Sequence, residues 1–335
     1  MKNRDDVADI TKGLLIILVV FGHSAFIQYY SNLHTLIYWF HMPAFIYMSG
    51  YFFKPVEREH LGAWIRKTAT RFFVPYFFII TLITVYRYLF TPINQQQFGN
   101  ELLHILAGGR YIDGYYAPIW FITCLFFCQL IFCLLSMFIK NKFLQISIIF
   151  LFFMAAHLES YLFPGLKIPI NIDVAFFALF FYAMGFYTKH LIKKESIQFA
   201  AFPLLLLVIY LVRKGYFEYF LDMKQHKYGN ILLDILIPLL GTVVIFTIGR
   251  MFVNSPFKNL MVYIGRNSQI IMYLHLVTAI ELYRLGLYTS VYVFVFIGVC
   301  LPLIFQEIFY FVKNRMGNSK KTVTEQRREF LIKSS

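Results

Sequence analysis

Residues 9–23 read Asp-Ile-Thr-Lys-Gly-Leu-Leu-Ile-Ile-Leu-Val-Val-Phe-Gly-His, an apolar run bracketed by Lys12 and His23. The two ionisable side chains are close to three helical turns apart, so on a helix both lie along one stripe. At about 1.5 Å of rise per residue they are about 16 Å apart, which places Lys12 at a membrane edge and His23 beyond the bilayer centre. Ionisable groups inside a membrane span are costly and by default mark a pathway or a site. The stretch therefore predicts a first transmembrane helix with a functional histidine, and a hydrogen bond that only packs helices is the alternative.

The composition extends this prediction to the whole chain. Of the 335 residues, 59% are hydrophobic and 14% are charged, against about 25% charged in a soluble domain. Apolar runs of about 20 residues recur from end to end and leave no room for a large soluble domain. We predict an all-α polytopic transmembrane bundle over residues 1–313, followed by a basic cytoplasmic tail over 314–335. About ten spans are expected, at 10–30, 34–53, 72–90, 117–139, 143–163, 172–190, 197–213, 230–250, 259–280 and 288–312.

The charge distribution predicts the orientation of the bundle. The formal net charge is +14, and most of the Lys and Arg residues fall in alternate connections and in the tail. The positive-inside rule then predicts that both termini are cytoplasmic, in the cell (inner or cytoplasmic) membrane, and no nucleic-acid partner is needed to explain the charge. The first segment has no small-residue cleavage site, so we interpret it as retained. The four cysteines lie in apolar runs and predict neither a disulfide framework nor a metal knuckle.

Two further histidines accompany His23. His41 and His275 are expected at a similar depth in the outer half of the membrane, so the three imidazoles can converge. Hydrogen bonds that only pack helices are an open alternative for both. Three imidazoles can hold zinc, but the spacings match no metal signature and no metal is expected. Other polar or aromatic candidates near these spans are Asp9, Ser49, Trp120, Asn267 and Ser268.

The connection over residues 54–71 is strongly basic. Arg66, Lys67 and Arg71 come at helical spacing just before an apolar span. Such residues are either cytoplasmic anchors whose side chains reach the lipid headgroups or a phosphate-binding patch at the inner face. On the other side, loops 91–116 and 214–229 are expected to form an outer roof.

Several motifs together resemble a known family. They are Asp9-Ile-Thr-Lys-Gly followed by Phe21-Gly-His23, then Phe40-His-Met-Pro43 and Ser49-Gly-Tyr51. The resemblance continues through Arg71 to Pro75, Trp120-Phe121 and Gly265-x-Asn-Ser268 with His275. This combination resembles the membrane-bound acyltransferase-3 family, most closely its fucose 4-O-acetylase-like branch. One departure is Met272, which stands where many members carry an aromatic residue.

The resemblance implies an O-acetyltransferase. It implies transfer of an acyl group, usually acetyl from cytosolic acetyl-CoA, to a hydroxyl on a surface glycan or a lipid-linked sugar. His23 is then the expected general base, because an imidazole titrates near neutral pH, and an acetyl-histidine intermediate is the variant left open. Lys12 with Arg66, Lys67 and Arg71 would position CoA, and Lys12 is also expected to act with His23 as a catalytic residue that orients the chemistry along the stripe. Asp9, His41, Ser49, Trp120, Asn267, Ser268 and His275 would line the site. The rival interpretations are a glycan exporter or flippase without transferase activity and a metal- or quinone-dependent redox enzyme.

Overall fold

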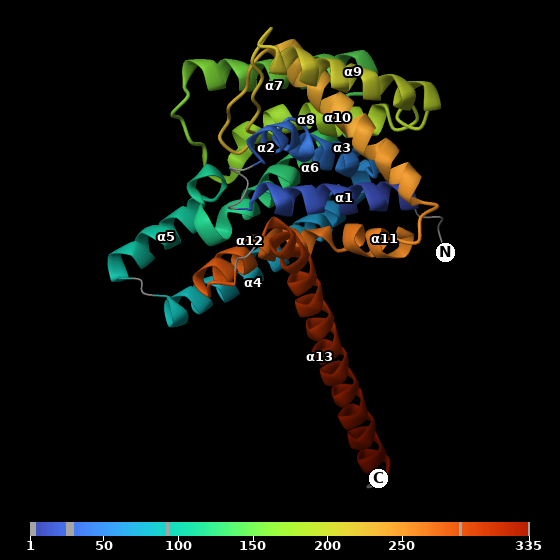
Figure 1. Ribbon diagram of the computed structural model, residues 1–335. Helices are drawn as coiled ribbons and strands as arrows, with labels where there is room; N and C mark the ends of the chain where they lie inside the picture. The colour runs from blue at the N-terminus through green and yellow to red at the C-terminus, as the bar shows by residue number, and fades with distance from the viewer. Residues whose placement is uncertain (1–4, 25–29, 92–93, 288–289, 334–335) are drawn as a thin grey trace.

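The computed structural model describes residues 5–24, 30–91, 94–287 and 290–333. Over these residues the chain is helical and forms no β-strand, which confirms the predicted all-α polytopic bundle (Figure 1). Four 3₁₀ helices, η2 (Arg58–His60), η3 (Gly109–Tyr111), η4 (Gly114–Ile119) and η5 (Pro169–Asn171), lie in or next to the connections. The α-helices are α1 (Asp6–Gly22), α2 (Ser31–Tyr38), α3 (His41–Tyr51), α4 (Leu61–Phe90), α5 (Gln95–Ala107), α6 (Trp120–Phe138), α7 (Lys142–Leu162), α8 (Ile172–Tyr187), α9 (Glu195–Arg213), α10 (Ile231–Phe252), α11 (Lys258–Arg266), α12 (Ser268–Arg284) and α13 (Val291–Lys333).

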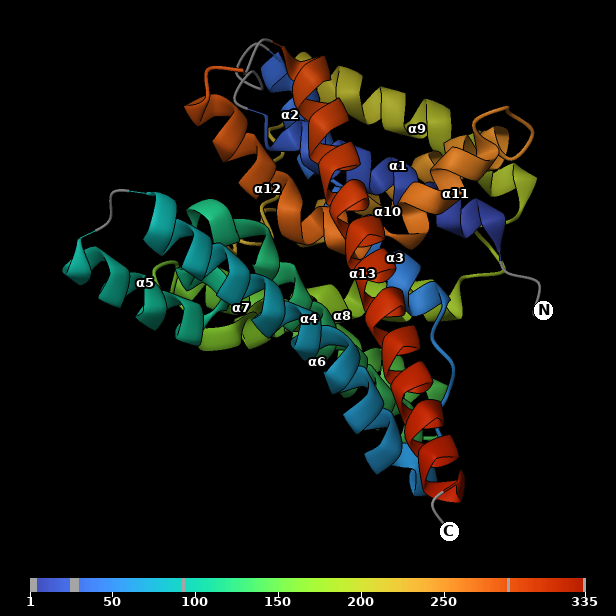
Figure 2. The same cartoon turned by 90° about the horizontal axis from the view of Figure 1, so that it is seen from below.

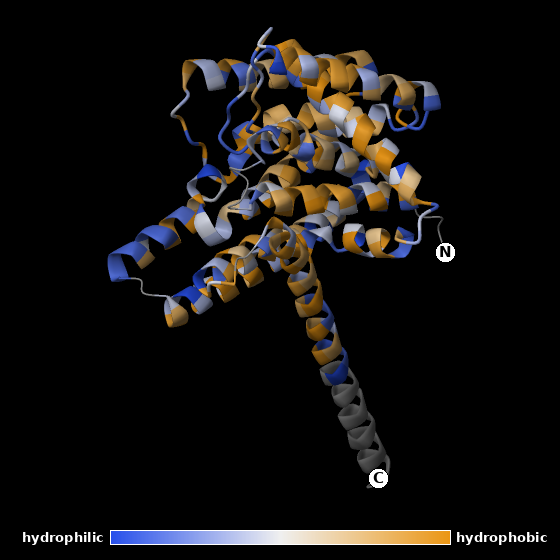
Figure 3. Cartoon of the chain, viewed as in Figure 1, coloured by the Kyte–Doolittle hydropathy of each residue, from blue (hydrophilic) through white to orange (hydrophobic). Residues whose placement is uncertain are grey.

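Among the described residues, seven helices are long and apolar enough to cross a membrane. They correspond to seven of the ten expected spans and are built on α4, α6, α7, α8, α9, α10 and α13. Figure 3 shows hydrophobic residues along these helices and hydrophilic residues in the connections and in α5. The chain is therefore a multi-pass membrane protein.

The other three expected spans contain shorter helices. The first is α1, of 17 residues, and the described chain continues only to residue 24. The second is broken at Trp39–Phe40 between α2 and α3, where Phe40 has an extended φ of −142° and Pro43 occupies the first turn of α3. The third is broken at Asn267 between α11 and α12. Helices broken at membrane depth are tolerated where the free backbone is buried in protein or lines a cavity, so these breaks point to a site.

Helix α1 lies at the centre of the bundle. It packs against α3, α10, α11, α12 and α13, and Figure 2 shows α13 crossing the face that α1 and α12 form. Its N-terminus is fixed by Asp5, whose carboxylate accepts hydrogen bonds from Ala8 N, Lys193 Nζ at 2.8 Å and Tyr51 OH. A Cβ on Gly265 of α11 would overlap the carbonyl oxygen of Asp9, so only glycine allows α11 to approach α1 this closely. Helix α1, which contains Lys12 and precedes His23, is thus the helix around which the others pack.

Two further glycines hold α3 against α8. A Cβ on Gly50 would overlap the carbonyl oxygen of Tyr182, and one on Gly185 would overlap that of Tyr47. Small residues let helix backbones approach closely and are a common means of association inside membranes. This contact fixes the direction in which α3 presents His41.

The last helix extends well beyond the bundle (Figure 1). Helix α13 continues through residues 314–333, which the sequence predicts to be a tail. The division at residue 313, the cytoplasmic orientation of the termini and the retention of the N-terminal segment stay predictions.

Candidate active site

His23 caps the C-terminal end of α1. Its Nδ1 lies 2.9 Å from the carbonyl oxygen of Val19, one turn earlier. Because a carbonyl oxygen only accepts hydrogen bonds, Nδ1 carries the proton in the neutral ring and Nε2 keeps its lone pair. The helix itself therefore selects the tautomer that presents a basic nitrogen beyond its end.

His41 and His275 repeat this arrangement. Nδ1 of His41 lies 2.8 Å from Ile37 O, and Nδ1 of His275 lies 2.9 Å from Ile271 O. The rings of His23 and His275 are 5.0 Å apart between centroids and inclined by 76°, an edge-to-face contact. The buried Nε2 of His275 has no hydrogen-bond partner among the described residues. His23 thus contacts His275, and His41 lines the same cavity as His23.

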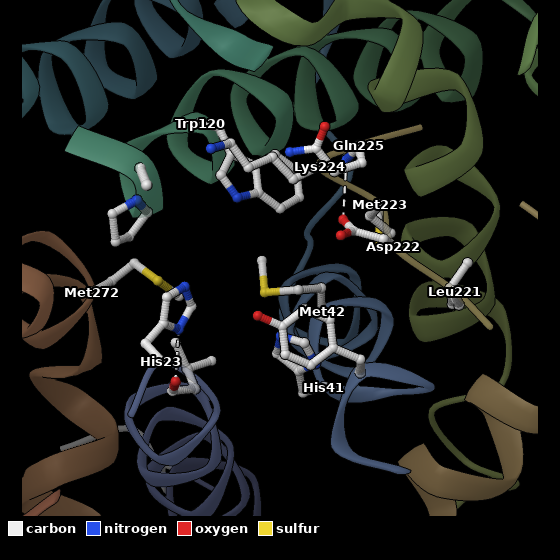
Figure 4. Close-up of a pocket in the computed structure, with 14 residues that line it drawn as sticks. His23, His41, Met42, Trp120, Leu221, Asp222, Met223, Lys224, Gln225 and Met272 are labelled. Carbon is white, nitrogen blue, oxygen red and sulfur yellow. Dashed lines mark hydrogen bonds between the residues drawn. The ribbon is translucent and has the colours of Figure 1, made fainter. Parts of the chain in front are cut away.

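A cavity of about 210 Å³ lies beyond the end of α1. In Figure 4, His23 and His41 lie on one side of it, and Trp120 and Gln225 lie across from them. An indole offers a flat apolar face and one N–H donor, and the Gln225 amide offers both a donor and an acceptor. The full lining is Val19, His23, Tyr38, His41, Met42, Ala117, Pro118, Trp120, Leu221, Asp222, Met223, Lys224, Gln225 and Met272. We call this the histidine cavity.

The two loops expected to form a roof meet over the histidine cavity. Lys224 donates from Nζ to Ile112 O at 2.8 Å and to Asp113 Oδ1 at 2.6 Å, which joins loop 214–229 to loop 91–116. Gln225 N donates to Asp222 Oδ1 at 3.0 Å, the contact drawn in Figure 4. Sequence reasoning placed the loops but missed Asp222 and Gln225 as lining residues, because a loop turn without a motif gives no signal for which side chains point inward.

A second, larger cavity of about 940 Å³ is lined in part by the same helices. Its lining includes Lys12, Lys67 and Arg71, together with Ser49 and Ser268. We call it the basic cavity. Its volume lies at the upper end of the range of about 300–1,000 Å³ that is usual for small-molecule sites.

Contacts on the cavity wall hold two of these cations in place. Lys12 Nζ lies 2.8 Å from an oxygen of Asp9 and 5.1 Å from the ring centre of Phe52. The Arg71 guanidinium donates to Gln129 Oε1 at 3.1 Å and stands 4.8 Å over the ring of Phe72. Both cations are thus positioned by protein groups while their charged ends line the cavity.

Four helices contribute residues to both cavities, at positions separated by 4 to 11 residues along each helix. Helix α1 contributes Lys12 to the basic cavity and His23 to the histidine cavity. The corresponding pairs are Ser49 and His41 on α3, Gln129 and Trp120 on α6, and Ser268 and Met272 on α12. The predicted stripe from Lys12 to His23 therefore runs from one cavity to the other.

Some predicted site residues lie elsewhere. Arg66 is exposed and is not part of the lining of the basic cavity, since it points away from the face that carries Lys67 and Arg71. Ser268 lines the basic cavity and not the histidine cavity. Asn267 ties the break between α11 and α12 to α13, accepting from Gln306 Nε2 at 2.5 Å.

Asp9 pairs with two cations, Lys12 and Arg266. Asp9 is buried and accepts from Arg266 Nε at 3.0 Å, in addition to its contact with Lys12. Arg266 lines the basic cavity, and sequence reasoning missed it. The position of Arg266 inside the Gly265-x-Asn-Ser268 motif is the feature of the sequence that could have indicated a site residue.

The fold and the geometry define a multi-pass helical membrane protein with a histidine cavity and a basic cavity. The comparisons give the family. The model described as Acyltransferase domain (Acyl_transf_3) matches residues 6–307, and the chain belongs to this family. The predicted resemblance to the acyltransferase-3 family is thereby confirmed.

A short match to one curated protein is consistent with the family. The chain is 46% identical over 57 residues to "Nodulation protein NolL" of Sinorhizobium fredii (strain NBRC 101917 / NGR234). This match covers 15% of the chain and 16% of that protein. No solved structure gives a significant match.

Proposed function

We propose that the protein transfers an acetyl group from cytosolic acetyl-CoA to a sugar hydroxyl of a surface or secreted glycan, including a lipid-linked precursor. The observation that carries this proposal is the arrangement of two chemically different cavities on the same four helices. The larger one is lined by Lys12, Lys67 and Arg71, and the smaller one is lined by two histidines together with Trp120. A thioester donor with a phosphorylated end and a hydroxyl acceptor need these two environments.

The basic cavity suits the phosphates of CoA. Lys12, Lys67 and Arg71 line it, and Arg266 adds a fourth cation. Arginine and lysine are the residues that bind phosphate in proteins, and a partly enclosed site strengthens the attraction. The charge distribution predicts that this end of the bundle faces the cytosol, where acetyl-CoA is available. The phosphopantetheine arm would then extend along α1 toward His23.

The histidine cavity suits the transfer step. His23 Nε2 removes the proton from the acceptor hydroxyl as its oxygen attacks the thioester carbonyl carbon. The carbon–sulfur bond breaks, the acetyl ester forms, and the departing CoA thiolate takes the proton from the imidazolium. Trp120 offers an indole face on which a sugar ring can stack, and Asp222 and Gln225 offer groups that bind hydroxyls.

His275 acts on His23 by contact. Its ring packs edge-to-face on the His23 ring, so it restricts the orientations that the base can take. His41 completes the wall on the side of α3. The variant in which His23 itself becomes acetylated uses the same Nε2 as nucleophile and returns the acetyl group to the acceptor in a second step.

The proposed function is tested by comparing surface-glycan O-acetyl groups by NMR in cells with wild-type protein, His23→Ala protein or no protein. We expect acetyl signals only with the wild type, although His23→Ala still inserts in the membrane. Labelled acetyl-CoA supplied to sealed vesicles gives the second measurement. Glycan that crosses the membrane without gaining label would instead support an exporter or flippase.

A further inference from the structure

A second group of ionisable residues lies away from the donor and acceptor cavities. Glu159 comes from the end of α7, Asp173 from the first turn of α8, and His226 from the connection between α9 and α10. One ligating atom from each of the three lies within 4.8 Å of the others. They come from three separate segments of the chain, so no sequence motif predicts that they lie together.

Several polar atoms in this group are buried without a hydrogen-bond partner among the described residues. They are Glu159 Oε1, Asp173 Oδ1 and His226 Nε2. Asp173 is 1% exposed and His226 is 3% exposed. A buried polar atom without a hydrogen bond costs about 1–3 kcal/mol, and more when it is charged. Such a group of unpartnered atoms indicates a bound polar guest, either ordered water or an ion.

The charges favour a cation. The two carboxylates face one guanidinium, that of Arg110, which hydrogen-bonds Asp173 Oδ2 and lies 3.9 Å from Glu159 Oε1. The formal balance of these three side chains is one negative charge. Arg110 occupies Oδ2 of Asp173 and leaves Oδ1 unpartnered, which is how a carboxylate that ligates a metal is usually oriented by a neighbouring donor.

The backbone holds His226 in place for such a role. Its φ is +57°, in the left-handed region that few residues other than glycine adopt, and its carbonyl oxygen accepts from Ser160 Oγ at 2.5 Å. This hydrogen bond fastens the connection to α7 next to Glu159. The imidazole is thereby directed into the group while the residues just before it line the histidine cavity.

We propose that Glu159, Asp173 and His226 bind a divalent transition-metal ion of the Zn²⁺ type. One imidazole nitrogen and two carboxylate oxygens form a donor set that zinc accepts, with a fourth position left for water. Zinc bonds of about 2.0–2.2 Å require the ligand atoms to approach more closely than 4.8 Å. Glu159, whose side chain is the most exposed of the three at 17%, can move inward to close the set.

The ion would have a structural role that reaches the acceptor side. His226 directly follows Leu221–Gln225, the part of the connection that lines the histidine cavity. An ion bound to α7, α8 and this connection fixes that segment over the cavity. The proposal rests on the described residues and is independent of which acyl group or acceptor is used. It departs from the sequence expectation of no metal, which considered only His23, His41 and His275.

Metal content tests the proposal directly. The full chain is purified in detergent with an affinity tag that lacks histidines, stripped with chelator, incubated with Zn²⁺ and desalted, and its zinc is measured by mass spectrometry. We expect about one zinc per chain in the wild type and at least tenfold weaker binding in Glu159→Gln and His226→Gln. The exposed residues Glu218 and His190 give the matched controls Glu218→Gln and His190→Gln, which should bind as the wild type does.

Thermal unfolding separates loss of zinc binding from misfolding of a variant. Glu159 is partly exposed and its Oε1 has no hydrogen-bond partner among the described residues, so Glu159→Gln is expected to fold. Zinc should raise the unfolding temperature of the wild type and of both controls but not that of Glu159→Gln. A wild type that retains no stoichiometric zinc, or a Glu159→Gln protein that retains as much as the wild type, would overturn the proposal and leave water held by Arg110 as the occupant.

Discussion

Replacing His23 by glutamine removes the basic nitrogen while keeping a side chain that can donate a hydrogen bond. His23 contributes Nδ1–H to the carbonyl oxygen of Val19 and Nε2 to the histidine cavity. Glutamine can approximate the first contact but has no group with a suitable pKa for the second. The substitution therefore separates the proposed chemical role of His23 from its role at the end of α1.

The two roles of His23 differ in the free energy that each contributes. A positioned general base is worth about 10²–10⁴-fold in rate, or about 2.7–5.4 kcal/mol of transition-state stabilisation. The hydrogen bond to Val19 is worth about 0.5–1.5 kcal/mol of folding free energy. The KM for acetyl-CoA should stay near its wild-type value, because His23 lines the histidine cavity and the proposed CoA contacts lie in the basic cavity.

The assay measures transfer of labelled acetyl from acetyl-CoA in membrane vesicles, normalised to folded protein. His157 gives a control, since its Nδ1 makes the same contact, 2.9 Å from Phe153 O, while its Nε2 lies 3.0 Å from Asp234 Oδ2, outside both cavities. His157→Gln should keep most of the wild-type kcat. A His23→Gln protein with more than a tenth of the wild-type kcat, or an equal loss in His157→Gln, would refute the reasoning.

Three further predictions follow from other parts of the molecule. Arg71→Gln should raise the KM for acetyl-CoA about tenfold with little change in kcat, measured in the same vesicles; an unchanged KM would remove Arg71 from the donor site. Gly185→Ala should lower the free energy of unfolding by about 1–3 kcal/mol or more, because the new methyl group overlaps Tyr47 O; a thermal shift within error of wild type would contradict the close packing of α3 on α8. Burial raises the pKa of Asp5, but hydrogen bonds from Lys193 and Tyr51 outweigh burial and hold the pKa below its usual value. The ionised Asp5 carboxylate therefore stabilises the fold at neutral pH, and this stabilisation is lost as the pH falls through the folded-state pKa. Asp5→Asn should therefore lose up to about 1 kcal/mol at pH 7 and show less loss in acid, whereas parallel pH profiles would contradict this assignment.

Much of the fold follows from hydrophobic run length alone. Seven expected spans fall on helices that are long and apolar enough to cross a membrane. The break at residues 39–40 does not follow from hydropathy, because apolar residues lie on both sides of it. The polar stretch 266–269 interrupts the apolar run at Asn267, but so short a stretch does not show whether the helix is broken there. Backbone groups freed at such breaks are satisfied by neighbouring helices, which only the packed structure reveals.

Some residues of the candidate site could likewise be predicted from the sequence, and others could not. His23 and Lys12 could be predicted because ionisable residues inside an apolar run are individually conspicuous. The cavity that Ser268 lines did not follow from the sequence, since helical spacing gives its face on α12 but not its depth relative to the neighbouring helices. Arg66 and Lys67 are adjacent in sequence, and only the rotation of α4 shows that Lys67 is the one that lines a cavity. Residues brought together by tertiary contacts alone, such as Glu159, left no pattern to interpret.

The central claim is that the donor and the acceptor occupy opposite ends of the stripe from Lys12 to His23. The most direct test is an experimental structure of the protein in lipid nanodiscs with CoA bound. We predict CoA phosphates in the basic cavity beside Lys67 and Arg71, with the thiol end directed along α1 toward His23. CoA phosphates bound in the histidine cavity, or outside both cavities, would contradict the account.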